Sequence, residues 1–326
     1  MADFSRITDW AVKNAAALNI SVTKQSWINE WLPGLFDYRV KLKIGKTIHI
    51  GRGIDAQENT ACDKAVAEAL ERAAASNLSY PWATAAYPDY AGAAERAYRE
   101  LVCIDRVLCH HFCRVKFSVI NIETLDWNIS IARLKKVLRK HELHLELCEL
   151  RPVLDASVSA AFIWSAKEHR VKGIASGFGC EKRLKDAAVQ AIIECLRTAI
   201  PVFFGDITPE PWEIIRTPGN PRWHFWQAQK QGARNFLVSN LLPGNNENGG
   251  LQNLENISMN DAVISEIDSL KPAIPDLPVR IAQASSPKLL RPQFGEILMD
   301  EPALRRLEIF AGASMTPEMV VPHFYD

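Results

Sequence analysis

Two alanine-rich stretches with helical periodicity stand out along the chain. Between residues 61 and 77, alanines recur every fourth position, and Val66 and Leu70 lie beside them. This spacing forms one apolar stripe of a helix, and the Ala, Leu, Glu, Lys and Arg that fill the stretch all favour helices. Residues 184–200 repeat the composition. The pattern predicts two helices whose small residues allow close packing against a neighbour.

Each of these predicted helices follows two extended segments and a Gly-x-Gly. Gly51–Gly53 precedes the first helix and Gly177–Gly179 precedes the second. Fifteen residues separate the last glycine of each pair from a glutamate, Glu68 or Glu194. The matched offset predicts two strand–turn–strand–glycine–helix units that each place a glutamate at the same point. We expect the glycines to form tight turns whose backbone amides a phosphate can approach.

The rest of the chain divides into helical, extended and turn-rich stretches. Helices are predicted over residues 7–19, 91–114, 129–140, 222–237, 259–270 and 301–310. Strands are predicted over 117–122, 143–150, 278–282 and 294–299, and residues 117–150 look like a βαβ-type insertion. Residues 81–91 and 242–250 are rich in turn formers. We predict an α/β (mixed α+β) fold in a single domain over 1–326, with 1–26 as a helical extension and 243–256 as a flexible loop.

The first helix carries two carboxylates near its glycines. Glu68 and Glu71 are three residues apart and leave the same face, and Arg72 is within reach of Glu68. Three interpretations stay open. They are a solvated face with a local Glu–Arg pair, a general acid/base pair, and a seat for a hard cation such as Mg2+, which takes oxygen ligands.

These residues fit a known set of motifs. Lys64, Glu68, Glu71 and Arg72 match S-x-x-x-E-x-x-E-R with Lys in place of Ser, and a later Q-x-x-x-E begins at Gln190 and is intact. In this respect the chain resembles the YcaO family, ATP-dependent enzymes that activate amide carbonyls by phosphorylation. The resemblance runs from about residue 27 to the end of the chain.

The middle motif of that family is matched in part. Glu100 and Asp105 correspond to the family's E-L-I-E-R-D stretch, but Arg96 stands where Ser is expected, and Cys103 and Ile104 replace Glu-Arg. A Pro-containing C-terminus, Pro322-His323, also fits the family.

The resemblance implies one nucleotide site around which the repeated units gather. Glutamates repel the negative charge of ATP, so they would act through Mg2+, which joins carboxylates to phosphate oxygens. The implied metal ligands are Glu68, Glu71, Glu100 and Glu194. The implied nucleotide-binding residues add Lys64, Arg72, Gln190 and Arg291, and His323 is the candidate catalytic base.

The activity implied by the resemblance is attack on a backbone amide by a side chain or by external sulfide or amine, followed by phosphorylation of the oxyanion by ATP. The products are azolines (cyclodehydration), thioamides or amidines in a ribosomally made peptide or protein. A separate substrate-recognition or sulfur-delivery protein is the expected partner, and a homodimer is possible. The alternative is a catalytically silent scaffold that binds peptide or a partner protein, which the changes at positions 64, 96, 103 and 104 favour. The carboxylate kept on every helix favours the enzyme.

The composition bears on nucleic-acid binding, membrane insertion and the redox state of the cysteines. Lys and Arg number 38, as do Asp and Glu, so no basic field points to nucleic acid. No apolar run approaches the roughly 20 residues that span a bilayer, and the seven cysteines show no disulfide spacing. We therefore expect a cytoplasmic protein with reduced thiols. Cys109 to Cys113, with two histidines between them, allow either a metal site or buried thiols with a packed histidine.

Overall fold

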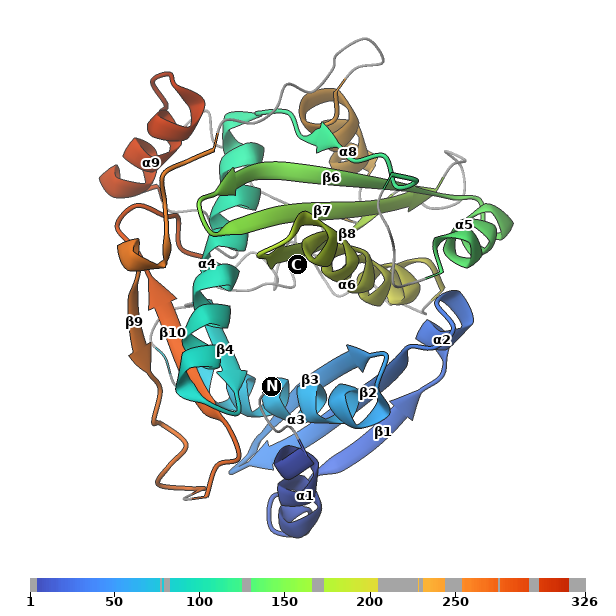
Figure 1. Cartoon of the computed structure of the whole chain (residues 1–326), viewed down its shortest axis with the longest axis vertical. Helices are drawn as coiled ribbons and strands as arrows, with labels where there is room; N and C mark the ends of the chain where they lie inside the picture. Colours follow the sequence, from blue (N-terminus) through green and yellow to red (C-terminus); the bar gives the residue numbers. More distant parts are fainter. Residues whose placement is uncertain are drawn as a thin grey trace. The chain divides into compact units, whose positions relative to one another are not determined.

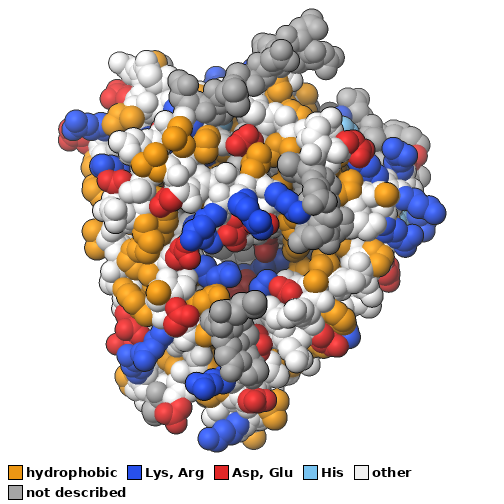
Figure 2. All heavy atoms as spheres, in the orientation of Figure 1, with side chains coloured by type: hydrophobic (Ala, Val, Ile, Leu, Met, Phe, Trp, Pro, Cys, Tyr) orange, Lys and Arg blue, Asp and Glu red, His pale blue; other side chains and the backbone are white. Residues whose placement is uncertain are grey.

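The computed structural model describes residues 5–76, 78, 83–124, 130–165, 173–204, 228, 231–243, 254–274, 276–292 and 299–316. The chain divides into two compact units. The first comprises Met1–Glu100 and Ala262–Ser285, and the second comprises Leu101–Asp261 and Ser286–Asp326. Acidic and basic side chains are interspersed on the face seen in Figure 2, as the balanced composition leads one to expect.

The first unit contains two antiparallel sheets. One has the order β1-β2-β3, and the other has the order β4-β10-β9. The elements of this unit are α1 (Ser5–Asn14), β1 (Ser21–Gln25), α2 (Trp27–Trp31), β2 (Phe36–Ile44), β3 (Thr47–Asp55), α3 (Glu58–Ala75), β4 (Ala83–Tyr87), β9 (Val263–Glu266) and β10 (Arg280–Ser285). Helix α3 packs on β2 and β3 and also contacts α1 (Figure 1). Its predicted apolar stripe is confirmed, because Ala65, Ala69 and Ala73 are almost fully buried.

The second unit is built on a four-stranded antiparallel sheet with the order β5-β6-β7-β8. Its elements are β5 (Ser118–Val119), α5 (Ile131–Lys140), β6 (Leu143–Val153), β7 (Ala156–Ser165), β8 (Ile174–Glu181), α6 (Leu184–Phe204), α8 (Gln231–Phe236) and α9 (Glu301–Ala311). A π-helical turn (Leu237–Leu241) follows α8, and a 3-10 turn (Met259–Asp261) ends the central segment. Helix α6 packs on β7 and β8, and α4 (Tyr90–Cys113) crosses the boundary between the units in sequence (Figure 1).

The two predicted hairpin–helix units are confirmed as β2–β3–α3 and β7–β8–α6, but their glycines do not form turns. Both glycine pairs lie inside strands, β3 and β8. A Cβ added at Gly53 would lie 2.0 Å from the carbonyl oxygen of Ala61, and one at Gly179 would lie 2.1 Å from that of Ala187. Glycine is required because strand and helix backbones touch there. The predicted phosphate-binding turn is therefore wrong.

Several predicted elements differ from the structure. Residues 259–270 were expected to be helical, but they form a short turn and strand β9. Residues 81–91 were expected to be a connection, but β4 occupies their centre because Thr84 and its neighbours pair with β10. The N-terminal helix ends at Asn14, and β1 pairs with β2 inside the stretch predicted as a helical extension.

The predicted βαβ insertion has the elements in the expected order, but β5 and β6 are antiparallel neighbours, so no parallel crossover exists there. All but the last residue of the predicted strand at 294–299, half of the predicted helix at 222–237 and most of the 243–256 loop lie outside the described residues. The described end of that predicted helix is confirmed by α8. The prediction of a mixed α/β fold is confirmed, and that of a single domain stays a prediction.

Candidate functional site

Glu68 is the most fully oriented of the predicted carboxylates. Its Oε2 accepts a hydrogen bond of 2.6 Å from the backbone N–H of Arg52 on β3. Its Oε1 lies 2.6 Å from Nη2 of Arg72, one turn further along α3, and the same guanidinium donates to the carbonyl of Ile50. The predicted local Glu–Arg pair is confirmed. Strand β3 therefore fixes the direction in which the Glu68 carboxylate points.

Glu71 lies one turn along the same face and is held by strand β4. Its two carboxylate oxygens accept hydrogen bonds from the Thr84 hydroxyl at 3.0 Å and from the Ala86 backbone N–H at 3.1 Å. Burial raises the pKa of Glu71 to about 8, and the negative charges of Glu68 and Glu100 add to the shift. The first unit therefore brings three of the predicted metal ligands close enough for their charges to interact.

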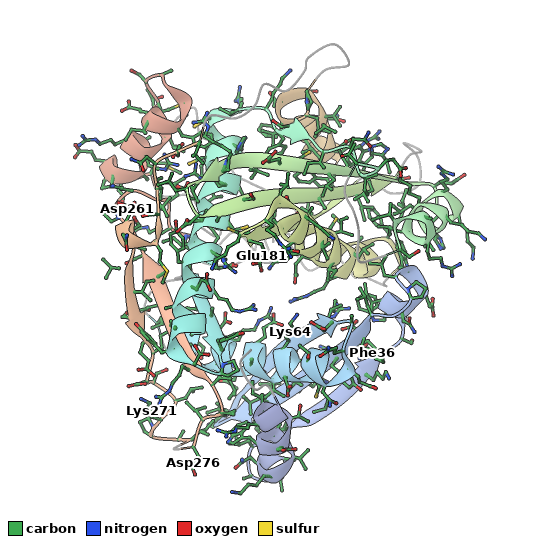
Figure 3. The ribbon with its side chains drawn as sticks, viewed as in Figure 1. Phe36, Lys64, Glu181, Asp261, Lys271 and Asp276 are labelled. Atoms are coloured by element: carbon green, nitrogen blue, oxygen red, sulfur yellow. The ribbon has the colours of Figure 1, made fainter. Side chains whose placement is uncertain are left out.

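Lys64, in the first half of α3, forms an ion pair with Asp55. Its ammonium lies 2.6 Å from Oδ2 of Asp55 at the end of β3, and Figure 3 shows it on α3. The side chain that replaces the family's serine thus balances a neighbouring carboxylate. This ion pair joins α3 to β3 within the same hairpin–helix unit.

The rest of the predicted set belongs to the second unit. On α6, Gln190 accepts a hydrogen bond of 3.2 Å from the backbone N–H of Cys180, and Glu194 lies 3.3 Å from Arg197. Arg291 pairs with Asp300 at 3.2 Å. The predicted catalytic residue, His323, lies outside the described residues.

Oxygen donors of this kind suit a hard cation. Among the described residues, no three His, Cys, Asp or Glu side chains are close enough together to hold a metal by themselves. Mg2+ is usually held by one or two carboxylates together with substrate phosphates and water. The carboxylates of Glu68 and Glu71, with the raised pKa of Glu71, fit an ion that arrives with a nucleotide.

Sequence reasoning missed the group that supports Glu68. The guanidinium of Arg52 is bidentate to the buried Asp37, with N–O distances of 3.0 and 2.7 Å, and it stacks 3.7 Å from the centre of the Trp27 ring. A paired, stacked guanidinium is held rigidly, so the amide of Arg52 that donates to Glu68 is fixed as well. The sequence indicates this pair only by an acidic residue, Asp37, and a basic residue, Arg52, on the two strands of one predicted hairpin.

The histidine and cysteines of α4 form part of the core. His110 is buried, its Nδ1 lies 2.9 Å from the carbonyl oxygen of Val115, and its ring contacts those of Phe117 and Phe310. Burial lowers the pKa of His110 to about 3, and it raises the pKa of the Cys109 thiol well above its ordinary value. The interpretation as a buried thiol with a packed histidine is therefore confirmed for Cys109 and His110, whereas Cys113 is only partly buried.

No helix in the described part of the chain is long and apolar enough to cross a bilayer.

The arrangement of strands and helices places this chain in a structural class. Two antiparallel hairpins, each covered by a helix that meets its strand backbone to backbone, make this a mixed α/β protein with an internal structural repeat. No protein-family model and no curated protein sequence matches the chain.

Solved structures do match it. The chain is similar to a heterocyclase in complex with substrate and cofactor, with 12% identity and a TM-score of 0.66 over 96% of this chain and 56% of the heterocyclase. It is also similar to YcaO from Methanopyrus kandleri bound with AMPPCP and Mg2+, with 12% identity and a TM-score of 0.59 over 87% of this chain and 90% of that one. The chain has the YcaO fold, and the resemblance expected from its motifs is confirmed at that level. It spans only about half the length of the heterocyclase.

Proposed function

We propose that this chain uses ATP and Mg2+ to activate a backbone amide of a ribosomally made peptide or protein by O-phosphorylation, giving an azoline or a thioamide. The fold supports this proposal, because it is shared with a heterocyclase and with a YcaO protein bound to AMPPCP and Mg2+. The observation that carries it is the group formed by Glu68, Glu71 and Glu100, in which the negative neighbours help to raise the pKa of Glu71 to about 8. A cation that takes the place of the Glu71 proton would offset the repulsion among these neighbouring carboxylates.

Each of these residues has a defined part in the proposal. Arg52 and Arg72 orient Glu68, while Thr84 and Ala86 anchor Glu71. Neither side chain would have to rearrange to accept Mg2+, and Glu71 would have to lose only its proton. Glu100 and Glu194 complete the proposed metal ligands. Lys64, Arg72, Gln190 and Arg291 are proposed nucleotide contacts. When bound, Mg2+ would neutralise phosphate charge and polarise the phosphoryl group.

The proposed reaction proceeds through addition, phosphoryl transfer and elimination. A thiol or hydroxyl of the substrate, or external sulfide, adds to the amide carbon, and the former carbonyl oxygen takes the γ-phosphoryl group of ATP. ADP is released, and the oxygen then leaves as phosphate. Addition of a side chain, with loss of the amide proton, gives an azoline, and addition of sulfide gives a thioamide. We assign removal of a proton in this sequence to His323. A separate protein would recognise the substrate or deliver sulfur, and the chain would act in the cytoplasm. The proposal also allows a homodimer.

A second candidate is a silent scaffold that binds peptide or a partner protein. The ion pair between Lys64 and Asp55 favours it, because that charge is engaged within its own hairpin–helix unit. The buried Cys103 favours it as well, since an apolar thiol replaces a charged residue of the family motif.

The deciding experiment is calorimetric titration of the purified chain with AMPPCP, with and without Mg2+. The test variant is Glu68→Gln/Glu194→Gln, and Glu30→Gln/Glu123→Gln is a control with the same charge change, one residue in each unit. We expect binding that needs Mg2+ and weakens at least about tenfold in the test variant, as loss of charge-assisted contacts implies, with the control unchanged. Absence of binding by the unmodified chain would favour the scaffold. Equal binding by both variants would show that the nucleotide lies elsewhere.

A further inference from the structure

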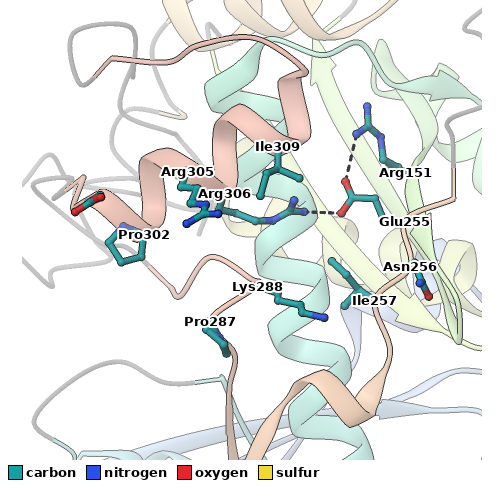
Figure 4. Close-up of a pocket in the computed structure, with 11 residues that line it drawn as sticks. Arg151, Glu255, Asn256, Ile257, Pro287, Lys288, Pro302, Arg305, Arg306 and Ile309 are labelled. Atoms are coloured by element: carbon teal, nitrogen blue, oxygen red, sulfur yellow. Dashed lines mark hydrogen bonds and ion pairs between the residues drawn. The ribbon is translucent and has the colours of Figure 1, made fainter.

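The second unit contains a cavity that the proposed function does not use. It has a volume of about 610 Å3 and lies among α9, the end of β6, residues 255–257 and residues 287–288 (Figure 4). Cavities that bind small ligands usually measure about 300 to 1,000 Å3. None of the residues assigned to the nucleotide site lines it.

A cluster of guanidinium groups lies against this cavity. Arg106, Arg151 and Arg306 surround the ring of Phe310, at 5.5, 4.1 and 5.5 Å from its centre. Two of them, Arg151 and Arg306, line the cavity. The neighbouring His110 adds no charge, because burial lowers its pKa to about 3. Three positive charges are therefore concentrated around one aromatic ring.

Two carboxylates of the described residues form ion pairs with these guanidinium groups. Asp105 lies 2.8 Å from Arg106 and 2.9 Å from Arg306. Glu255 lies 3.0 Å from Arg306 and 3.2 Å from Arg151, as the dashed lines in Figure 4 show. Each carboxylate is thus shared by at least two guanidinium groups.

Two hydrogen-bond donors of Arg106 in this cluster are not used within the described residues. Arg106 is fully buried, and its Nε and Nη1 have no hydrogen-bond partner in the part of the chain that the structure describes. A buried charged donor without a partner is costly. An additional anion nearby would offset that cost.

The rim of the cavity adds charge and an apolar surface. Arg305 is exposed on α9, and no carboxylate of the described residues pairs with it. Lys288 also lines the cavity, paired with Asp261 at 2.6 Å, and Glu301 is the acidic residue of the rim. Ile257 and Ile309 supply apolar contacts, and Ile309 is 65% exposed.

We propose that this cavity binds a small molecule with one carboxylate or phosphate group on an apolar body. The anionic group is held by Arg151, Arg305 and Arg306, whose planar guanidinium groups match both oxyanions. The apolar body lies against Ile257 and Ile309. This site is independent of the proposed nucleotide site and stands if that proposal fails.

The test uses three probes of one shape on the full chain: phenylacetate, phenyl phosphate and the neutral phenylacetamide. Calorimetry measures affinity, and methyl NMR of isoleucine-labelled protein locates the site through the signals of Ile257 and Ile309. We expect a charged probe to bind and shift these two signals, and phenylacetamide to bind much more weakly. The stronger of the two charged probes identifies the natural anionic group.

The matched variants are Arg305→Gln, at the rim, and Arg139→Gln, an exposed arginine on α5 outside the cavity. Arg305→Gln leaves the buried cluster intact and should weaken the charged probe about fivefold to tenfold, as expected for one charge-assisted contact. Arg139→Gln should have no effect. The proposal is overturned if no charged probe binds, if phenylacetamide binds equally well, or if the two variants behave alike.

Discussion

The two units treat buried carboxylates in opposite ways. In the first unit, burial raises the pKa of Glu71 to about 8, and its neighbours Glu68 and Glu100 add to the effect. In the second unit, burial acts on Asp105 in the same direction, but Arg106 and Arg306 outweigh it and hold the pKa of Asp105 below its ordinary value. The difference lies in the neighbouring charges. Burial alone therefore does not decide whether an acid keeps its proton.

The contrast also indicates what each region is suited to receive. Around Glu71, two neighbouring carboxylates add to the raised pKa, which suits a cation. Around Phe310, three guanidinium groups surround one ring and two of them line a cavity, which suits an anion. Two complementary ligand classes are thus expected from one chain of zero net charge. Three predictions test this comparison.

The largest effect is expected from Asp105→Asn. This change leaves Arg106 and Arg306 buried with one carboxylate fewer, and breaking a buried pair in this way costs about 3–5 kcal/mol. Denaturant unfolding of the variant measures the loss. Asp186→Asn, which removes a surface ion pair with Arg183, is the control and should cost no more than about 1 kcal/mol. Similar losses for the two variants would contradict the importance of the buried cluster.

The backbone beneath the carboxylates can be tested with Gly53→Ala and Gly179→Ala. Each new Cβ would meet a helix carbonyl oxygen, so each variant should lose about 3 kcal/mol of stability, at the upper end for overpacking. Only Gly53→Ala should also change the titration of Glu71, because only it displaces α3. Gly232→Ala, a helical position with open space around it, is the control and should not destabilise. An unchanged unfolding midpoint in either test variant would argue against the close contact.

The third prediction is a dependence of stability on pH. Glu71 has an ordinary pKa of 4.5 and a folded pKa of about 8, so the native state keeps a proton that the unfolded state has lost. Its contribution to stability is complete below pH 4.5 and is lost as the pH rises to 8. Glu71→Gln removes this loss, and its advantage over the unmodified chain should grow by about 1 kcal/mol per pH unit.

Unfolding curves between pH 5 and 8, recorded without Mg2+ or nucleotide, measure this effect. Glu30→Gln serves as the control. Parallel profiles for Glu71→Gln and the unmodified chain would show that the carboxyl group of Glu71 is already ionised at neutral pH.

Strong helical periodicity made the long helices predictable, although it failed at residues 259–270, which form a turn and a strand. The expected helix at 91–114 agrees with α4 to within one residue at each end, and α6 begins at Leu184 as expected. The constant offset between glycine and glutamate was enough to reveal the repeat. It failed on the role of the glycines, because a Gly-x-Gly has the same sequence whether the backbone turns or touches a helix.

Long-range partners were beyond the reach of local patterns. Asp105 and Arg306 are 201 positions apart, and the residues next to either one give no indication that the two side chains pair. The partners of Glu71 were missed for a related reason, since residues 81–91 look turn-rich and conceal the strand that carries Thr84 and Ala86. Spacing thus predicted which residues matter in the first unit. The protonation state of Glu71 required the folded geometry.

The backbone contact between each glycine strand and its helix divides the work within the repeat. No Cβ fits where Gly53 and Gly179 meet the helix backbones, so this contact sets the spacing between strand and helix, while helix side chains such as Glu68 and Gln190 bond to the strand backbone beside it. The two hairpin–helix units therefore have corresponding helix positions. Glu194 of α6 stands at the position that Glu68 occupies in α3, and Arg197 stands at the position of Glu71. The effect of a substitution in one unit can thus be compared with that of its counterpart on the same kind of backbone contact.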